Sequence, residues 1–151
     1  MWENILNKLK ELIESTDNFN QVETYEVEQF KGSPTAIIVP SSNENDYYSS
    51  NENVRIYSFM IVLYVNRSVT APGKKVEIEA DRVMRKLIDS VIDKCDRNYT
   101  LTGIECPDGY TFINLFAMPS AWGYSGRDDE YRVATINVRC RVLVDVEVIG
   151  E

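Results

Sequence analysis

Histidine is absent from the chain, and other features that mark function classes are scarce. Without an imidazole, no mechanism that needs a histidine base is available, and most zinc sites are excluded. The longest basic run is the pair Lys74-Lys75, so the Lys and Arg clusters that bind nucleic-acid phosphates are missing. No apolar run approaches the roughly 20 residues that cross a bilayer. We therefore expect no sequence-specific nucleic-acid binding and no membrane insertion.

Cysteine is also scarce. Cys95, Cys106 and Cys140 form an odd set with no CxxC spacing. This usage is typical of buried free thiols in a reducing compartment. The opening residues Trp2, Glu3 and Asn4 do not have the basic and apolar regions of a secretion signal, so we expect a cytoplasmic site of folding.

The composition is that of an ordinary globular protein. In 151 residues, 24 acids stand against 16 Lys plus Arg, for a formal net charge of -8, and 44% of the residues are hydrophobic. This length allows one domain with a substantial core and leaves little room for a second.

Two segments have the spacing of amphipathic helices. Near the N-terminus the apolar residues recur at every third or fourth position: Trp2, Ile5, Leu6, Leu9, Leu12 and Ile13. The second helix is expected from about Lys75 to Lys94. Its apolar stripe contains Val76, Ala80, Val83, Leu87, Val91 and Cys95, widened by Ile88 and Ile92.

Six segments have strand character, namely 22–30, 35–39, 54–66, about 100–106, 110–117 and 131–149. Both faces of 54–66 are largely apolar, which predicts a central strand covered on both sides. Pro107-Asp108-Gly109 predicts a tight turn between the fourth and fifth strands. A loop is expected from Met118 to Glu130.

The stretch 40–53 is unusual because it contains no aliphatic side chain. It has the five residues Ser-Ser-Asn-Glu-Asn twice, on either side of Asp46-Tyr47-Tyr48. We interpret it as a polar loop excursion. The sequence thus predicts a single α+β domain over residues 1–151, with two amphipathic helices packed on a mostly antiparallel sheet.

The length of the last strand bears on assembly. A compact domain of this size has a diameter of roughly 40 Å. Residues 131–149 span about 60 Å if they are fully extended. The strand must therefore bend, break or project. A projecting strand with an apolar face needs a neighbour, which indicates a homo-oligomer, whereas a bulge or kink removes that inference.

No segment has a recognisable catalytic pattern. Ala71-Pro72-Gly73-Lys74-Lys75 is better explained as a turn into a helix than as a phosphate-binding loop, because Arg67 and Lys75 replace essential residues of that motif. Asp128, Asp129 and Glu130 are most simply a solvated loop. We therefore predict no catalytic residue, no cofactor and no metal site, and hence no enzyme.

Residues 35–66 have an ordered pattern that matches a known family. An apolar strand ends at Pro40-Ser41, and a polar loop leads through Glu52-Asn53 into Arg55, Tyr57, Phe59, Ile61 and Leu63-Tyr64-Val65. A helix precedes this pattern, and a second helix with Asp81, Arg82, Leu87 and Ile88 and a long C-terminal strand follow it. From about Trp2 to Val148 the chain resembles the tail terminator, or tail completion, proteins of long-tailed bacteriophages.

That resemblance implies a structural virion protein. It implies a homo-oligomeric ring, commonly of six subunits, that sits on the last ring of the tail tube, ends tube polymerisation and takes part in head–tail joining. The implied partners are other copies of the chain, the tail tube protein and the head–tail connector protein. The implied location is the virion tail, after assembly in the cytoplasm of the bacterial host.

A ring needs two different complementary patches on each subunit. We expect them on 41–53, on 119–130 and on the C-terminal strand. Aromatic residues on glycine-containing loops favour interface anchors. The interface residues predicted on this basis are Tyr47, Tyr48, Trp122 and Tyr124, with Asp128, Asp129 and Glu130 as a polar rim.

Three other interpretations fit the sequence. The chain is alternatively another component of the head–tail junction, such as an adaptor or stopper. A monomeric cytoplasmic domain whose 40–53 segment binds a peptide is a further alternative. The third is a small carboxylate enzyme, which requires Asp128, Asp129 or Glu130 to converge with Glu105 or Asp108 in a pocket.

Overall fold

A five-stranded sheet forms the body of the protein in a computed structural model that describes residues 1–47, 52–67 and 76–149. The elements are α1 (Trp2–Glu14), β1 (Gln21–Glu23), β2 (Thr35–Tyr47), β3 (Glu52–Asn66), α3 (Val76–Arg97), β4 (Tyr110–Ser125), the 3₁₀ helix η1 (Arg127–Asp129), β5 (Tyr131–Asp145) and α4 (Val146–Ile149). The strand order is β1-β2-β3-β5-β4, and every pair except the short β1–β2 pair is antiparallel.

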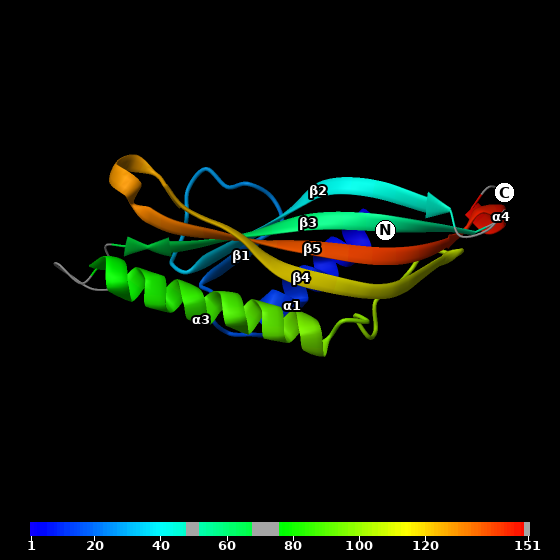
Figure 1. Cartoon of the computed structure of the whole chain (residues 1–151), viewed down its shortest axis with the longest axis horizontal. Coiled ribbons are helices and arrows are strands. Elements are labelled where there is room, and N and C mark those ends of the chain that lie inside the picture. Colours follow the sequence, from blue (N-terminus) through cyan, green and yellow to red (C-terminus); the bar gives the residue numbers. More distant parts are fainter. Residues whose placement is uncertain (48–51, 68–75, 150–151) are drawn as a thin grey trace.

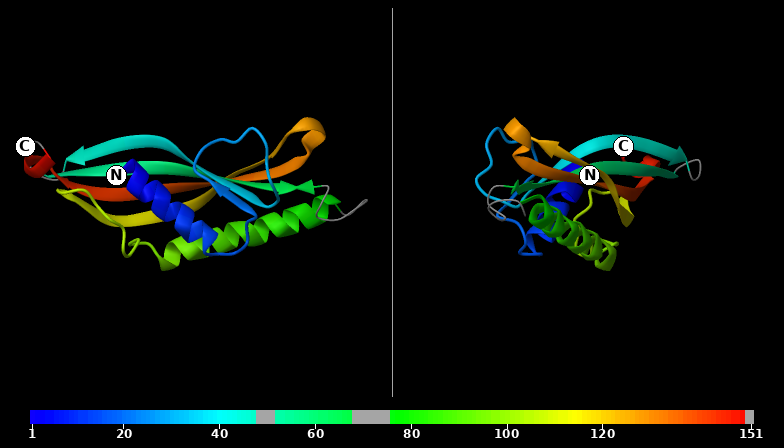
Figure 2. Two further views of the ribbon diagram at one scale, coloured as in Figure 1. Left: turned by 180° about the vertical axis from the view of Figure 1, so that it is seen from behind. Right: turned by 60° about the vertical axis from the view of Figure 1, so that its left-hand side comes forward.

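Helices α1 and α3 lie on the same face of this sheet (Figures 1 and 2). The predicted fold class is therefore confirmed: the chain is one α+β domain with two amphipathic helices on a mostly antiparallel sheet. Both helices lie where the apolar periodicity placed them, and α3 continues three residues past Lys94 to Arg97.

The core lies between the helices and the sheet. The helices contribute Ile5, Leu6, Leu9, Ile13, Ala80, Met84, Leu87, Ile88, Val91 and Cys95, and β3 and β5 contribute alternate residues from Tyr57 to Val65 and from Ala134 to Val144. The indole of Trp2 packs edge-on against Tyr57 and Phe59, with ring centroids 4.8 Å and 5.2 Å apart. Each fully buried large side chain contributes about 1.5–3 kcal/mol.

The opposite face of the sheet has no helix over it in the part of the chain that the structure describes. On β3 this open face is lined by Ile56, Ser58, Met60, Val62 and Tyr64, all half-buried, and β4 adds Phe116 and Met118, which are 55% and 54% exposed. The prediction that 54–66 is a central strand is confirmed, because β3 lies between β2 and β5, but its coverage on both sides is wrong for most of its length. On the open face the loop between β1 and β2 reaches it only at the end near Tyr64, where Phe30 packs at 4.7 Å between ring centroids.

Residues 40–47 and 52–53 belong to strands, so the predicted polar loop excursion at 40–53 is wrong there; residues 48–51 lie outside the described part. The polar end of β2 pairs with β3, with Asn43 opposite Tyr57 and Glu44 opposite Ile56. Asn43 Nδ2 donates to the carbonyl of Ile56 at 3.1 Å. Backbone pairing supplies the stability that the polar side chains do not.

The C-terminal strand is shorter than predicted and does not project. β5 ends at Asp145, whose Oδ1 accepts the N–H groups of Glu147 (3.1 Å) and Val148 (3.4 Å) and so begins α4. Throughout its length β5 is paired with β3 on one edge, and most of it is paired with β4 on the other. β5 spans roughly 50 Å. It stays within the sheet because β3 and β4 are of similar length, so the length of this strand does not indicate an oligomer.

Three further boundaries differ from the predictions. The segment 22–30 is mostly loop, because β1 ends at Glu23, and 100–106 has no strand. The predicted loop 118–130 is instead the end of β4 followed by η1. A bulge between Pro119 and Trp122 interrupts the regular alternation, so the sequence pattern there does not indicate a strand.

All three cysteines are free thiols, as predicted; Cys95 and Cys140 are buried, while Cys106 is half-buried. Burial, with the charge of Asp96, raises the pKa of the Cys95 thiol to about 12. Burial also raises the pKa of Cys140, with a smaller effect from Cys95. Of the helices in the described ranges, none has the length and apolar character to cross a membrane.

The two faces of β3 predict different mutational costs. Phe59→Ala removes a fully buried ring and should lower the free energy of unfolding by about 3–5 kcal/mol. Met60→Ala, the neighbour on the open face, should cost about 1 kcal/mol or less. Urea unfolding followed by circular dichroism measures both. Equal losses would contradict a core confined to the helix side.

Candidate functional site

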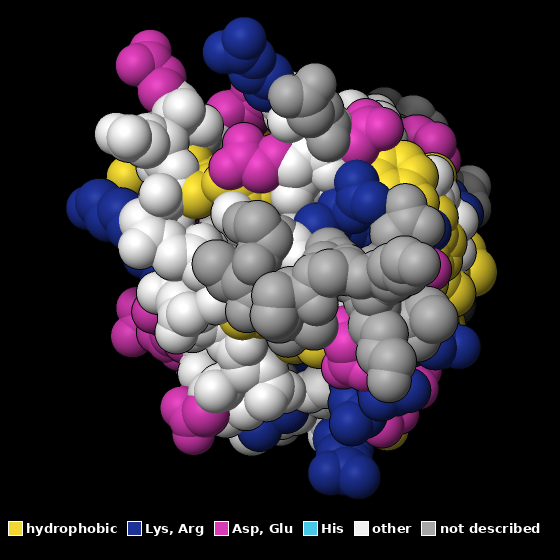
Figure 3. Space-filling model, turned by 90° about the vertical axis from the view of Figure 1, so that its left-hand side faces the viewer, with side chains coloured by type: hydrophobic (Ala, Val, Ile, Leu, Met, Phe, Trp, Pro, Cys, Tyr) yellow, Lys and Arg dark blue, Asp and Glu magenta, His cyan; other side chains and the backbone are white. Residues whose placement is uncertain are grey.

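The tip of the β4–β5 hairpin carries most of the predicted interface residues and lies at one end of the molecule (Figure 1). Figure 3 shows this end face on, with acidic and basic side chains intermixed. Gly126 begins the hairpin tip with φ 84°, a left-handed conformation suited to glycine. A Cβ at this position would come within 3.2 Å of the Tyr131 ring. The Glu130 N–H donates to the carbonyl of Arg127 at 3.2 Å and closes η1.

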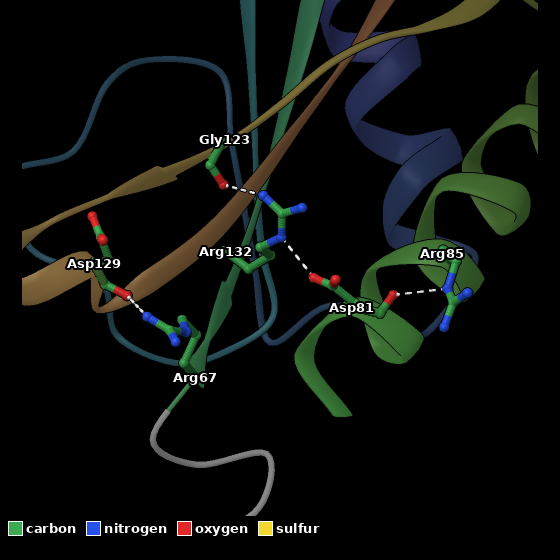
Figure 4. Close-up of polar contacts among 6 residues, drawn as sticks. All are labelled: Arg67, Asp81, Arg85, Gly123, Asp129 and Arg132. Carbon is green, nitrogen blue, oxygen red and sulfur yellow. Dashed lines mark hydrogen bonds and ion pairs between the residues drawn. The ribbon is translucent and has the colours of Figure 1, made fainter. Parts of the chain in front are cut away.

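Arg132 holds this hairpin against α3 (Figure 4). Its guanidinium carbon lies 4.8 Å from the Trp122 ring centroid and 4.5 Å from that of Tyr124. Nη1 donates to the carbonyl of Gly123 at 2.7 Å, and Nε pairs with Asp81 Oδ1 on α3 at 2.6 Å. The Arg132 side chain is only 14% exposed, so these partners replace most of its water.

A second cation extends this arrangement. The guanidinium carbon of Arg67 lies 5.3 Å from the Tyr124 ring centroid, and Nη1 donates to the carbonyl of Asp129 at 2.8 Å. The Arg67 N–H donates to the carbonyl of Glu130 at 3.0 Å. The end of β3 is thereby tied to the hairpin tip. We call Arg67, Trp122, Tyr124 and Arg132 the cation–aromatic cluster.

The predicted interface residues fall into two groups. Trp122 and Tyr124, 41% and 49% exposed, lie with Asp129 and Glu130 on the hairpin. Asp128 is part of η1, but its side chain lies outside the described part. Tyr47 is opposite Asn53 at the other end of the sheet, and Tyr48 lies outside the described residues. The seven residues therefore do not form one patch on a single subunit.

Sequence reasoning missed the residues that hold the aromatic pair in place. Asp81 and Arg132 are 51 residues apart, and nothing in the local pattern links them. The sequence does place Trp122 and Tyr124 on alternate positions, and a basic residue follows on the next strand. That pattern indicates a contact only when the register of the hairpin is known, in which Tyr124 is opposite Arg132.

The carboxylates required by a small metal-dependent enzyme lie in separate places. Glu130 lines a pocket at the hairpin, whereas Glu105 lines a shallow pocket beside α1. Within residues 1–47, 52–67 and 76–149, no three Asp, Glu or Cys side chains are grouped so that they could hold a metal ion.

No strand of the described chain covers most of either outer edge of the sheet, although the Leu115 N–H on the outer edge of β4 donates to the carbonyl of Tyr99 at 2.8 Å. No strand there pairs with the outer edge of β4, and β1 covers only Thr35–Ile37 of β2, which leaves the edge from Ile38 to Tyr47 open. Free strand edges are the surfaces through which sheets extend between chains.

Comparison with known proteins gives a likeness to solved structures and none in sequence. No protein-family model matches the chain, and no curated protein matches it in sequence. Among solved structures, it is similar to a chain of the "Virion of native gene transfer agent (GTA) particle", with 10% sequence identity and a TM-score of 0.44 over 87% of this chain and 84% of that chain. A likeness of this strength does not assign a function.

The geometry predicts that Arg132 stabilises the hairpin far more than a surface arginine on the same strand. Arg132→Leu should lower the free energy of unfolding by about 1–3 kcal/mol and increase amide hydrogen exchange over residues 119–126. Arg139→Leu is the matched control. It removes an exposed ion pair with Glu44 (3.3 Å) and should cost about 0.5 kcal/mol or less. Equal effects would contradict a structural role for the cation–aromatic cluster.

Proposed function

We propose that the chain is a structural protein of a phage virion that forms a homo-oligomeric ring of six subunits at the end of the tail tube. In this proposal the ring ends tube polymerisation and joins tail to head. It contacts the tail tube protein on one side and the head–tail connector protein on the other, and it has no enzymatic activity. The sequence resemblance from about Trp2 to Val148 supports the family, and the sheet edges support the ring.

The observation that carries the ring is the relation between the two free edges. β2 and β4 run antiparallel, because each step from β2 through β3 and β5 to β4 reverses direction. Two copies in the same orientation therefore bring β4 of one beside β2 of the next as an antiparallel pair. Such a contact joins two different surfaces, as a ring of identical subunits requires.

The usable parts of the two edges also lie at the same level of the sheet. Ser42 is opposite Ser58, which is opposite Arg139, which in turn is opposite Phe116. The segment from Ser42 to Tyr47 on β2 thus lies level with the first half of β4. Both stretches are free of proline, so their outward N–H groups can donate to a neighbouring strand, except that of Leu115, which already donates to the carbonyl of Tyr99 at 2.8 Å.

Prolines limit this pairing to one half of each edge. Pro40 on β2 and Pro119 on β4 have no N–H, and each is next to a break in register. Beyond them the two edges are poor templates for continued pairing. The hairpin half of β4 would then contact a neighbour through side chains, with Trp122 and Tyr124 as anchors.

Solution mass tests self-assembly. Light scattering after size exclusion, at two protein concentrations and two salt concentrations, should give six times the chain mass at the higher protein concentration. Trp122→Ala should weaken association by about tenfold or more and leave the monomer folded. Tyr25→Ala, which removes an exposed aromatic ring from the loop between β1 and β2, should leave association unchanged. A strict monomer would contradict the ring, and a Trp122→Ala chain that unfolds would show that Trp122 belongs to the core.

A disulfide tests the edge pairing itself. In a Cys106→Ser background, the double variant Ser42→Cys and Phe116→Cys should form a ladder of covalent multimers on oxidation, whereas either single variant should stop at dimers. Within one subunit the two positions are three strand spacings apart, about 14 Å, too far for an internal disulfide. A hexamer without a ladder would retain the ring and contradict this contact.

A further inference from the structure

A second site lies on the open face, at the hairpin end of the sheet. There the loop between β1 and β2 covers β3 and β5 and leaves a pocket of about 700 Å³. Three carboxylates and three aromatic rings line it, from Glu26, Glu28, Phe30, Tyr64, Glu130 and Tyr131. None of them belongs to the cation–aromatic cluster, which lies on the helix side.

Hydrogen bonds donated by backbone N–H groups hold the loop that forms one wall of this pocket. The Lys31 N–H donates to Gln21 Oε1 at 2.9 Å, and the Asn20 N–H donates to the carbonyl of Pro34 at 2.9 Å. The Asn66 N–H donates to Ser33 Oγ at 2.9 Å and joins the loop to β3. The loop is therefore anchored on both sides of the acidic stretch 26–28.

Three aromatic rings from distant parts of the chain form the pocket floor. Phe30 lies 4.7 Å from Tyr64 and 4.9 Å from Tyr131, between ring centroids, and Tyr64 and Tyr131 are 6.2 Å apart. The Tyr131 ring is perpendicular to both of the others, at 90° and 89°. Rings in this arrangement present both faces and edges, and a ring face attracts a cation.

The charge of the pocket is negative. Among the described residues that line it there are three carboxylates and no Lys or Arg. Burial raises the pKa of Tyr64, and the charge of Glu26 adds to the rise. Burial also raises the pKa of Tyr131, with a further rise from Glu130 and an opposing effect of its hydrogen bond with Asn66. Both phenols thus stay neutral at neutral pH and face nearby carboxylates.

We propose that this pocket binds the guanidinium group of an arginine side chain that another protein presents. A guanidinium is planar and weakly hydrated, so it stacks on aromatic rings while its N–H groups donate to carboxylates. The chain already holds Arg132 in this way, against two rings and one carboxylate. A metal ion fits the pocket less well, because no three carboxylates of the described residues converge. The site goes beyond the proposed ring and does not depend on it.

A single-side-chain probe tests the site in the intact protein. Nα-acetyl-L-arginine N-methylamide, titrated into labelled protein, should shift the NMR signals of Phe30, Tyr64 and Tyr131 saturably, with a dissociation constant on the order of 1–10 mM. The citrulline analogue has nearly the same shape without the charge and should bind at least tenfold more weakly.

Paired variants separate the pocket from general charge attraction. Glu26→Gln with Glu28→Gln should weaken arginine binding about tenfold or more. Glu14→Gln with Glu147→Gln removes the same amount of charge from exposed positions elsewhere and should leave binding unchanged. Unchanged amide signal dispersion shows that each variant is folded.

Three results would overturn the proposal: shifts that do not saturate, equal binding of the citrulline analogue, or equal loss in both pairs of variants. None of these readouts uses oligomer mass. A failed arginine site therefore leaves the ring proposal untouched, and a monomeric protein leaves the arginine site untouched.

Discussion

The pairing of β3 with β5 over the full length of both strands is the constraint on which the rest of the structure depends. Fifteen residues of each strand are in register without a break, from Glu52 opposite Asp145 to Asn66 opposite Tyr131. Because side chains alternate along both strands, this register gathers the aliphatic residues of both onto one face. A slip of one residue would move Phe59 and Val138 out of the core. Helices α1 and α3 then cover this face and no other.

Because helices α1 and α3 cover only one face, the sheet retains exposed surfaces that are unusual in a soluble monomer. The open face carries exposed apolar side chains such as Phe116, and in the described chain no strand covers most of the outer edge of β2 or β4. The prolines and bulges on β2 and β4 break these edges into short stretches, which limits uncontrolled pairing and still permits a specific one. The same features are those expected of a subunit whose sheet continues into a neighbour.

How far the sequence predicts this structure depends on how local each signal is. Helices α1 and α3 follow from a periodicity contained in each segment. The polar end of β2 does not, because its place in the sheet is set by backbone pairing with β3 rather than by its own side chains. Trp122 and Tyr124 are recognisable as candidate anchors from composition, but the partner of Arg132 is Asp81 on another element. Likewise Phe30, Tyr64 and Tyr131 meet only when the loop folds over the sheet.

The two aromatic sites are linked through adjacent residues at the start of β5. Tyr131 is opposite Asn66 and faces the open side, whereas Arg132 is opposite Val65 and faces the helices. A cation bound over the Tyr131 ring would therefore lie on the opposite side of β5 from the guanidinium group of Arg132. Glu130, which lines the pocket, accepts the N–H of Arg67 through its carbonyl. Glu130 and Tyr131 thus connect the pocket to the cation–aromatic cluster, and Arg132 and Asp81 connect that cluster to α3.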